Sequence, residues 1–250
     1  MVQEVEHIKP YQPQGSKTEQ VRDMFDAIAP AYDFMNRAMT LGIDRWWRRV
    51  AVNRVKRHLR NVATPSLLDV ATGTGDFALL LHDRLSPVHI TGIDLSQGML
   101  DVAMRKVTDK GLAGDITFEQ GDCLSLPYRD GLFDAVTVAF GVRNFEHLDI
   151  GYSQMHRVLR TGGMLCVLEL STPQNRLIRW FYDLYTLHII PWMGTLKSGD
   201  KSAYRYLPQS IAAVPQGQEM LQLMRQAGFT RCQASTLTLG TCTVYTAIKS

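Results

Sequence analysis

An arginine and an asparagine follow a hydrophobic segment that is typical of a buried strand. The segment FDAVTVAF covers residues 133–140, and Arg143 and Asn144 stand shortly after it. Open α/β sheets bind ligands in the crevice beyond the carboxyl ends of their strands. A guanidinium in that crevice keeps its charge and favours the ionised form of a hydroxyl bound beside it. The alternative is a salt bridge between Arg143 and Glu146 or Asp149.

A glycine loop joins another apolar strand to a helix. In DVATGTGDFALLL, Thr72, Gly73 and Gly75 lie between the two elements, so the backbone can approach a ligand at the helix N-terminus. Asp94 ends the next strand, where a carboxylate can accept hydrogen bonds from ribose hydroxyls. These residues predict a nucleoside-binding site. A glycine turn without a ligand is the alternative, because the fingerprint alone is weak.

Acidic residues around this loop favour a cationic nucleoside over a pyrophosphate. Asp69 precedes the loop and can order it or reach a cationic group, and Asp76 follows it. An adenosine that carries a positive sulfonium fits this environment better than a dinucleotide. Its adenine would lie near GDCLSLP, where Asp122 can accept from the exocyclic amine and Cys123 offers its backbone N–H. Asp122 can equally be a turn-forming residue after a strand.

Alternating strands and helices position these residues. Apolar strands that alternate with helices indicate a parallel sheet with helices on both faces. Near the C-terminus, residues 229–236 and 241–249 predict a hairpin, so the last strand would run antiparallel to its neighbour. The expected strands before it are 66–72, 89–95, 116–122, 133–140 and 164–170, and the expected helices are 76–85, one that starts near Ser96, one through MHRVLR (155–160) and one over 217–229.

The sequence predicts a single domain with an extension at its N-terminus. Residues 1–17 are polar and rich in Pro and Gln, which predicts a flexible N-terminus. The domain itself spans 18–250. Its first part, 18–62, predicts helices that are interrupted at Pro30, and residues 173–214 form an insertion before the last helix.

Composition and charge argue against several classes of protein. Hydrophobic residues make up 45% and charged residues 20% of the 250 residues, the balance of a globular protein. The net charge of +3 does not indicate a nucleic-acid partner, and the basic segment 45–60 reads as a solvated helix face rather than a site for an anionic surface. Four scattered cysteines and seven histidines without metal-ligand spacing predict a reduced protein with no metal site. No signal peptide or membrane span is expected.

Several longer stretches are far more specific together than the glycine loop alone. Through them the chain resembles, over residues 18–248, the menaquinone/ubiquinone C-methyltransferases (UbiE/MenG), a family of class I S-adenosylmethionine-dependent methyltransferases. This resemblance implies a Rossmann-like α/β fold with a mostly parallel seven-stranded sheet, an antiparallel last strand and an N-terminal helical lid over residues 18–62. The stretches are YDFMNRAMTLGIDRWW (32–47), LLDVATGTGD (67–76), FDAVTVAFGVRNFE (133–146), RVLRTGGMLCVLEL (157–170) and YRYLPQSI (204–211).

The chain departs from the family pattern at a few positions. Ala139 and Thr40 stand where serine is usual, and Asp44 stands where histidine is common. No role of that histidine can be carried over to this chain.

The resemblance implies methyl transfer from S-adenosylmethionine to a ring carbon of a polyprenyl hydroquinone. The leading substrate is demethylmenaquinol, which becomes menaquinol in the last step of menaquinone biosynthesis. The alternatives are a 2-polyprenyl-6-methoxy-1,4-benzoquinol of the ubiquinone pathway and a non-catalytic scaffold that only binds the cofactor. An NAD-dependent oxidoreductase is a further reading, for which no nicotinamide site is found.

The resemblance also assigns roles to the candidate residues. Arg143 and Asn144 would act on the hydroxyl of the hydroquinone. Its proton would leave to water or to Asp122, with His147 as the weaker candidate. Tyr32 and Asp33 would lie near the substrate, unless they only pack between helices. The expected cofactor contacts are Asp69, Thr72, Gly73, Gly75, Asp94, Asp122 and Cys123.

An aromatic segment follows the fifth strand. Residues 175–194 contain two Trp, one Phe and two Tyr, with apolar side chains at helical spacing as far as His188. Core packing is one reading. The other is a channel for the isoprenoid tail that also touches the bilayer, since Trp and Tyr suit its interface. We therefore expect a cytoplasmic protein with transient, peripheral contact to the inner face of the membrane, and leave a homo-oligomer open.

Overall fold

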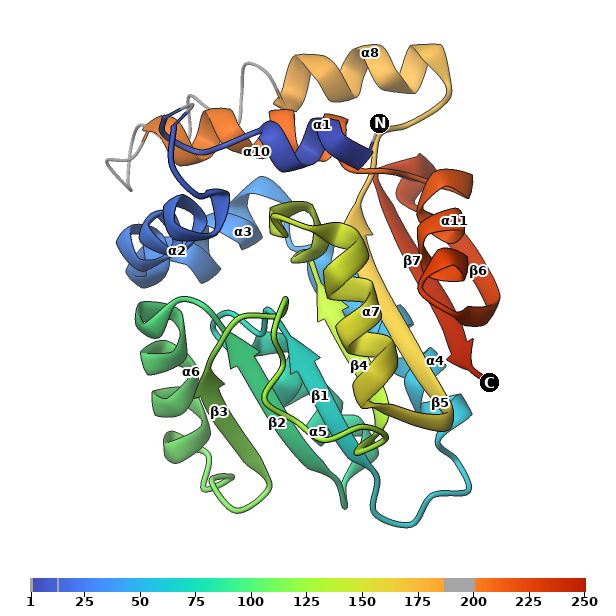
Figure 1. Ribbon diagram of the computed structural model, residues 1–250. Helices are drawn as coiled ribbons and strands as arrows, with labels where there is room; N and C mark the ends of the chain where they lie inside the picture. The colour runs from blue at the N-terminus through green and yellow to red at the C-terminus, as the bar shows by residue number, and fades with distance from the viewer. Residues whose placement is uncertain (1, 13, 187–200) are drawn as a thin grey trace.

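A seven-stranded sheet forms the centre of the protein (Figure 1). The structure is a computed structural model that describes residues 2–12, 14–186 and 201–250. The strand order is β3-β2-β1-β4-β5-β7-β6, and β7 pairs antiparallel with both β5 and β6. The predicted sheet, mostly parallel with an antiparallel last strand, is confirmed. Its strands are β1 (Ser66–Val70), β2 (His89–Asp94), β3 (Ile116–Gln120), β4 (Phe133–Ala139), β5 (Leu159–Leu170), β6 (Phe229–Leu237) and β7 (Cys242–Lys249).

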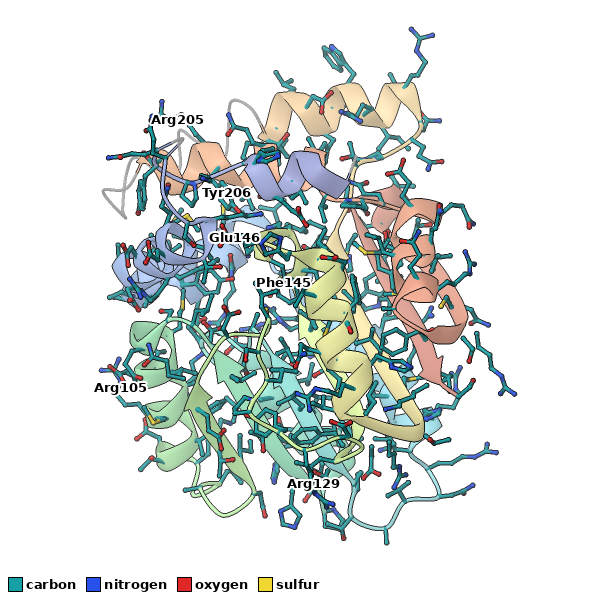
Figure 2. The ribbon with its side chains drawn as sticks, in the orientation of Figure 1. Arg105, Arg129, Phe145, Glu146, Arg205 and Tyr206 are labelled. Atoms are coloured by element: carbon teal, nitrogen blue, oxygen red, sulfur yellow. The ribbon has the colours of Figure 1, made fainter. Side chains whose placement is uncertain are left out.

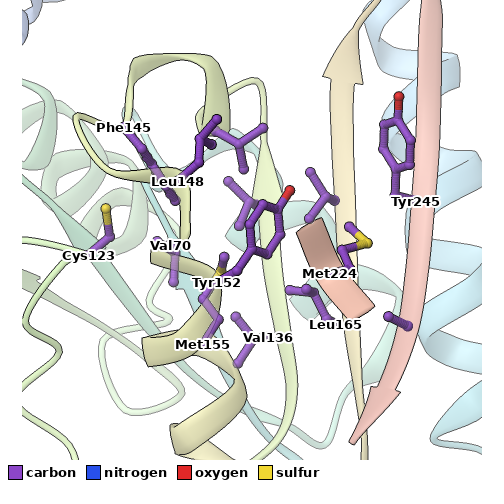
Figure 3. Packing of buried hydrophobic residues seen from close by; sticks show 14 of the residues in the cluster. Val70, Cys123, Val136, Phe145, Leu148, Tyr152, Met155, Leu165, Met224 and Tyr245 are labelled. Carbon is purple, nitrogen blue, oxygen red and sulfur yellow. The ribbon is translucent and has the colours of Figure 1, made fainter. Parts of the chain in front are cut away.

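Helices cover both faces of the sheet because its central strands are apolar on both sides. Leu67 and Leu68 are successive residues of β1, so their side chains point to opposite faces, and both are fully buried. Leu68 belongs to a core with α7 and α11 that includes Tyr152 and Tyr245 (Figure 3). Leu67 belongs to a second core with α4 and α5. The helices are α4 (Asp44–His58), α5 (Asp76–Leu85), α6 (Gln97–Asp109), α7 (Leu148–Val158) and α11 (Gln218–Gln226).

The remaining helices lie at the end of the sheet where β1, β2 and β4 finish (Figure 1). The lid was expected over residues 18–62, but α4 packs against a face of the sheet, so we call only α2, the short helix η1 and α3 the lid. In Figure 1 the lid stands above the arrowheads of the parallel strands, and α8 and α10 form the layer farthest from them. The bounds are α1 (Val2–His7), α2 (Lys17–Ile28), η1 (Ala29–Ala31), α3 (Tyr32–Met39), α8 (Arg176–Leu184) and α10 (Lys201–Ala213).

The boundary between α7 and β5 differs from the expectation. A helix was expected to continue through MHRVLR, but α7 ends at Val158. Leu159 already pairs with Phe133 in the sheet. Residues 159 and 160 therefore belong to a strand, although the sequence periodicity indicated a helix. As a result, β5 starts five residues before the expected Met164.

The ends of the chain carry more secondary structure than the sequence indicated. Residues 1–17, expected to be flexible, include α1, and the side chains of Val5 and Lys17 are fully buried. The insertion 173–214 contains α8 and α10, and residues 187–200 lie outside the described part of the chain. Mobility of the N-terminus stays a prediction.

Glu146 fastens the start of the lid to the loop that follows β4. Its carboxylate accepts hydrogen bonds from the hydroxyls of Ser16 and Thr18, both at 2.7 Å. It also accepts from the backbone N–H groups of Lys17 and Thr18, both at 3.0 Å. A carboxylate at a helix N-terminus complements the helix dipole. Glu146 therefore holds α2 against the loop (Figure 2), and it is not the ion-pair partner of Arg143.

Lys17 joins three segments at one buried point. Its ammonium donates to the backbone carbonyls of Val5 at 2.7 Å and of Arg143 and Phe145 at 3.1 Å each. Burial lowers the pKa of Lys17 to about 8, so the ammonium form prevails at neutral pH. Through this side chain, α1 and α2 are bound to the segment that carries Arg143.

Replacing Glu146 tests whether this anchor holds the lid. Burial alone would raise its pKa, but the hydrogen bonds from Ser16 and Thr18 lower it from 4.5 to about 2. The stabilisation is therefore complete above pH 4.5 and is lost as the pH falls from 4.5 towards 2. We expect Glu146→Gln to lower the free energy of unfolding at neutral pH by about 1–2 kcal/mol, because charged hydrogen bonds are lost at a partly exposed site.

Urea unfolding near neutral pH and near pH 3 measures this difference, with Asp83→Asn, an exposed carboxylate on α5, as the control. The cost of Glu146→Gln should shrink at the acidic pH, and the control should change little at either pH. An equal cost at both pH values would contradict the role of the ionised carboxylate.

Candidate active site

Asp69 and two threonines fix the shape of the glycine loop. The Asp69 carboxylate accepts hydrogen bonds from Thr72 Oγ1 and Thr137 Oγ1, both at 2.6 Å. Burial raises the pKa of Asp69 to about 6, although the two hydroxyls act in the opposite direction. Asp69 and Thr72 thus order the loop, which is one of the two roles that the sequence suggested for Asp69.

The two glycines of the loop serve different purposes. Both have left-handed backbones, with φ of 56° at Gly73 and 76° at Gly75. A side chain at Gly75 would come within 3.0 Å of Ala103 and Phe118, so glycine is required for packing there. A side chain at Gly73 would meet no atom within 4 Å. The loop is therefore open at Gly73, whose N–H donates to Asp94 at 2.7 Å.

A cavity beside the loop encloses about 700 Å³, part of which opens to solvent. We call it the glycine-loop cavity. Gly73, Asp94, Asp122 and Cys123, all expected cofactor contacts, line it together. Asp94 also accepts a hydrogen bond from the N–H of Ser96 at 2.9 Å, which fixes the carboxylate at the end of β2. The structure thus brings the expected ribose acceptor and adenine site into one space.

Asp122 forms a turn and also lines the cofactor cavity, the two alternatives that the sequence left open. Its Oδ1 accepts from the N–H of Leu124 at 2.9 Å, so it forms the turn after β3. It also lines the glycine-loop cavity, where its other oxygen can accept from a ligand. Cys123 beside it has a buried thiol, and burial raises the pKa of that thiol far above its ordinary value.

A second cavity of about 970 Å³ lies between the lid, α4, α8 and α10. We call it the aromatic cavity, because most of its wall is apolar or aromatic. Asp122 does not line it, so the structure does not place Asp122 to accept a proton there. The wall includes Trp47, Phe140, Leu170, Tyr182, Tyr185 and Leu207, together with the two cations Arg48 and Arg143.

Arg143 is held by the buried carboxylate of Glu169, a residue of β5 in the sheet. Its Nη1 donates to Glu169 Oε1 at 2.8 Å and to the carbonyl of Phe140, and its backbone N–H donates to Glu169 Oε2 at 3.3 Å. Only 6% of Arg143 is exposed. Burial opposes the charge, but Glu169 raises the pKa of Arg143 above its ordinary value. Its buried Nε has no partner among the described residues and is left to donate.

Asn144 is oriented by a tyrosine from α10. The hydroxyl of Tyr206 donates to Asn144 Oδ1 at 3.1 Å, and Tyr206 is buried. The amide nitrogen of Asn144 is thereby left as a donor, and Asn144 lines the glycine-loop cavity. Arg143 and Asn144 thus face the aromatic cavity and the glycine-loop cavity, respectively.

Tyr32 and Phe140 line both cavities and mark where they meet. Phe140 has φ of 60°, a left-handed conformation that costs energy for a residue with a side chain. Its N–H donates to the carbonyl of Leu168 at 2.7 Å, which holds the backbone in this conformation. A group that passes from one cavity to the other must pass beside these two rings. The expected position of Tyr32 near a substrate agrees with this geometry.

Asp33 is placed differently from what the resemblance implied. Its Oδ1 accepts from Thr74 Oγ1 at 2.6 Å, and its Oδ2 lies 2.5 Å from the ammonium of Lys106. Asp33 lines neither the glycine-loop cavity nor the aromatic cavity. It ties α3 to the glycine loop and α6, and contact between Asp33 and a substrate stays a prediction.

Several residues of the site were missed in the sequence. Glu169 had a visible signal, because it is the single acid in the apolar strand MLCVLEL. Arg48 also had one, because it stands one helical turn after Asp44, its ion-pair partner. Phe140 and Tyr206 had no such signal. Their positions depend on contacts between elements that are distant in the chain.

Solved structures with similar folds support the fold assignment. The cyclase SpnF aligns with a TM-score of 0.68 and 19% identity, covering 93% of this chain and 96% of that protein. A Haemonchus contortus phosphoethanolamine N-methyltransferase 2, solved with S-adenosyl-L-methionine, aligns with a TM-score of 0.61 and 15% identity over 80% of this chain and 52% of its own. At these identities the likeness concerns the fold.

Relatives with much higher identity cover nearly the whole chain. A Bacteroides fragilis protein named demethylmenaquinone methyltransferase is 50% identical over 98% of both chains. A Porphyromonas gingivalis protein with the same name is 43% identical over 99% of this chain and all of its own. A Geotalea daltonii protein named ubiquinone/menaquinone biosynthesis C-methyltransferase UbiE is 43% identical over 93% and 97%.

The family profile described as the ubiE/COQ5 methyltransferase family matches residues 13–249. This match and the relatives confirm the predicted resemblance, the enzyme class and S-adenosylmethionine as the cofactor. Because the profile spans nearly the whole chain and the relatives reach 50% identity, the chain belongs to the ubiE/COQ5 methyltransferase family.

Proposed function

We propose that the protein methylates a ring carbon of demethylmenaquinol and so produces menaquinol. The observation that carries this proposal is the buried Arg143–Glu169 pair at the wall of an aromatic cavity that adjoins the glycine-loop cavity. The relatives named demethylmenaquinone methyltransferase support this substrate. Other relatives carry the UbiE name for both pathways, so the methoxy-benzoquinol is the second candidate.

The glycine-loop cavity suits S-adenosylmethionine. The loop is open at Gly73, Asp94 would accept from the ribose hydroxyls, and Asp122 with the N–H of Cys123 would hold the adenine. When bound, this cofactor supplies a methyl group that is activated by a positive sulfonium. The residues of the chain must then align the two reactants, and correct alignment can be worth about 7–11 kcal/mol. Tyr32 and Phe140, which line both cavities, define the passage for this alignment.

Arg143 makes the ring carbon nucleophilic by favouring ionisation of the adjacent hydroxyl. A phenol titrates near pH 10, so only about one molecule in a thousand is ionised at pH 7. Glu169 holds the guanidinium of Arg143 in place. The Nε of Arg143, which has no protein partner in the described part of the chain, donates to the hydroxyl oxygen. Lowering the pKa of that hydroxyl by about two or three units is worth roughly 3–4 kcal/mol.

The proton of the hydroxyl leaves to water. Once the ring carbon has gained the methyl group, the hydrogen on that carbon leaves as a proton to water and the oxygen takes a proton back, so the hydroquinone is restored and one proton is released overall. Arg143 stays protonated and cannot accept it. Among the described residues of the aromatic cavity, Asp44 is the only carboxylate, and it is paired with Arg48. Asn144 lies next to Arg143 but lines the glycine-loop cavity, so its amide can hold a water there rather than contact the hydroxyl directly.

Substitution of Arg143 tests the proposed reaction. With labelled S-adenosylmethionine and a short-tailed demethylmenaquinol under anaerobic conditions, Arg143→Ala should lower kcat about 100- to 1000-fold, the factor given by two to three units of hydroxyl pKa. The activity of the variant should rise with pH up to about 10, because the substrate then ionises without help. Binding of S-adenosylhomocysteine, measured by calorimetry, should be unchanged.

Two outcomes would contradict parts of this proposal. A variant with nearly full activity would remove Arg143 from the chemical step. A wild-type protein that methylates only the methoxy-benzoquinol would assign the second substrate.

We further propose that α8 conducts the polyprenyl tail towards a membrane surface. Tyr182, Tyr185 and Thr186 of this segment line the aromatic cavity. On the outside, Leu177, Trp180, Phe181 and Leu184 are between 46% and 67% exposed, which is unusual for large apolar side chains on one short helix. No helix in the described part of the chain is long and apolar enough to cross a membrane. His188, which was expected to continue this face, lies outside the described residues.

Replacing the outer face of α8 tests the membrane contact. Wild-type protein should float with liposomes that contain the quinol, because Trp and Phe enter the interface. The triple variant Leu177→Ser, Trp180→Ser, Phe181→Ser should float much less and keep its activity on a short-tailed substrate. The matched control is Ile150→Ser, an exposed apolar residue on α7. Failure of the wild type to float, or equal flotation of the triple variant, would contradict the proposal.

A further inference from the structure

A third, smaller pocket extends the glycine-loop cavity beneath the loop. It encloses about 330 Å³, and we call it the polar pocket. Tyr32, Ala71, Gly73 and Ala139 line both spaces, so the two are continuous around the loop. Asp94 and Asp122 line only the glycine-loop cavity. A cofactor with its ribose and adenine at those two acids therefore extends its other end, the methionine part, towards the polar pocket.

The methionine part of the cofactor carries an ammonium and a carboxylate, and the polar pocket offers groups for both. Asp69, which also accepts from two threonines, and Asp76, which is also paired with Lys106 at 2.6 Å, line it and supply negative charge for the ammonium. Arg48 is the cation that lines it among the described residues. Arg22 lines the glycine-loop cavity instead, where its side chain is 44% exposed and paired with Asp23.

Arg48 is fixed in place and retains unused donors. It is 9% exposed, and its Nη1 donates to Asp44, which in turn accepts from Thr40 Oγ1 at 2.9 Å. Its guanidinium carbon lies 5.2 Å from the centre of the Phe140 ring. The buried Nε of Arg48 has no partner in the described part of the chain. A buried donor without a partner is unfavourable unless a ligand supplies the acceptor.

We propose that Arg48 binds the carboxylate of the methionine part of S-adenosylmethionine, with Asp44 as the residue that positions it. A guanidinium matches a carboxylate because it presents parallel N–H groups to the two oxygens. This inference depends on the cofactor and not on the identity of the quinol. Arg48 also lines the aromatic cavity, but a neutral hydroxyl there needs no second buried cation.

Ligands with and without the carboxylate provide the test. Calorimetry would compare S-adenosylhomocysteine with its decarboxylated analogue, 5′-(3-aminopropyl)thioadenosine, which keeps the amine. Wild-type protein should bind S-adenosylhomocysteine roughly 10- to 100-fold more tightly, the range expected for a charged hydrogen-bonded contact. Arg48→Met should lose that preference by weakening only the binding of S-adenosylhomocysteine. Arg22→Met, the matched control, should keep it.

Three results would overturn the inference. In the first, Arg48→Met keeps the wild-type preference for S-adenosylhomocysteine over the decarboxylated analogue. In the second, the variant binds both ligands more weakly by the same factor. In the third, the KM for the quinol rises and the binding of S-adenosylhomocysteine is unchanged. The last result would assign Arg48 to the hydroquinone. If Arg48→Met leaves Asp44 unpaired and fails to fold, the double variant Asp44→Asn, Arg48→Met removes both charges and is held to the same criteria.

Discussion

The buried ion pair between Arg143 and Glu169 is the interaction on which the rest of the site depends. A charge with so little exposure must be paired, because an isolated buried charge is strongly unfavourable. The pair arises from neighbouring parallel strands, since Ala139 of β4 lies opposite Leu168 of β5. The residues beyond these two positions therefore meet at the same edge of the sheet. The register that forms the core also places the cation beside the aromatic cavity.

The lid is held over this edge by carboxylates rather than by apolar packing alone. Asp26 accepts from Ser96 Oγ at 2.6 Å and from the N–H of Gly98 at 2.9 Å, so α2 caps α6. Asp33 and Glu146 fasten the other parts of the lid to the glycine loop and to the loop after β4. Because α2 supplies part of the wall of the glycine-loop cavity, these contacts also shape the cofactor site.

The elements that repeat a simple pattern could be predicted from the sequence. Alternating apolar strands and helices indicated the parallel sheet, and the terminal hairpin indicated its antiparallel end. Gly73, Asp94 and Arg143 could be located because each follows a strand, and strand ends of a parallel sheet meet. The sequence pattern therefore predicts that the glycine loop and the loop after β4 belong to one site.

Contacts between distant segments could not be predicted in this way. Asp33 was assigned to the substrate, but Thr74 and Lys106 bind it, and neither partner is near it in the chain. The partner of Arg143 was sought among nearby acids, whereas the sheet supplies Glu169. In each case the backbone pattern places the element, and the tertiary packing selects the partner.

The most direct test of this account is the ionisation of a bound ligand. We would titrate the ultraviolet absorbance of 4-methoxy-1-naphthol, a single-hydroxyl analogue of the hydroquinone, bound with S-adenosylhomocysteine to wild type and to Arg143→Met. The account predicts that the pKa of the naphthol is lowered by about two to three units in the wild type and not in the variant. Equal pKa values in the two proteins would contradict the central role of Arg143.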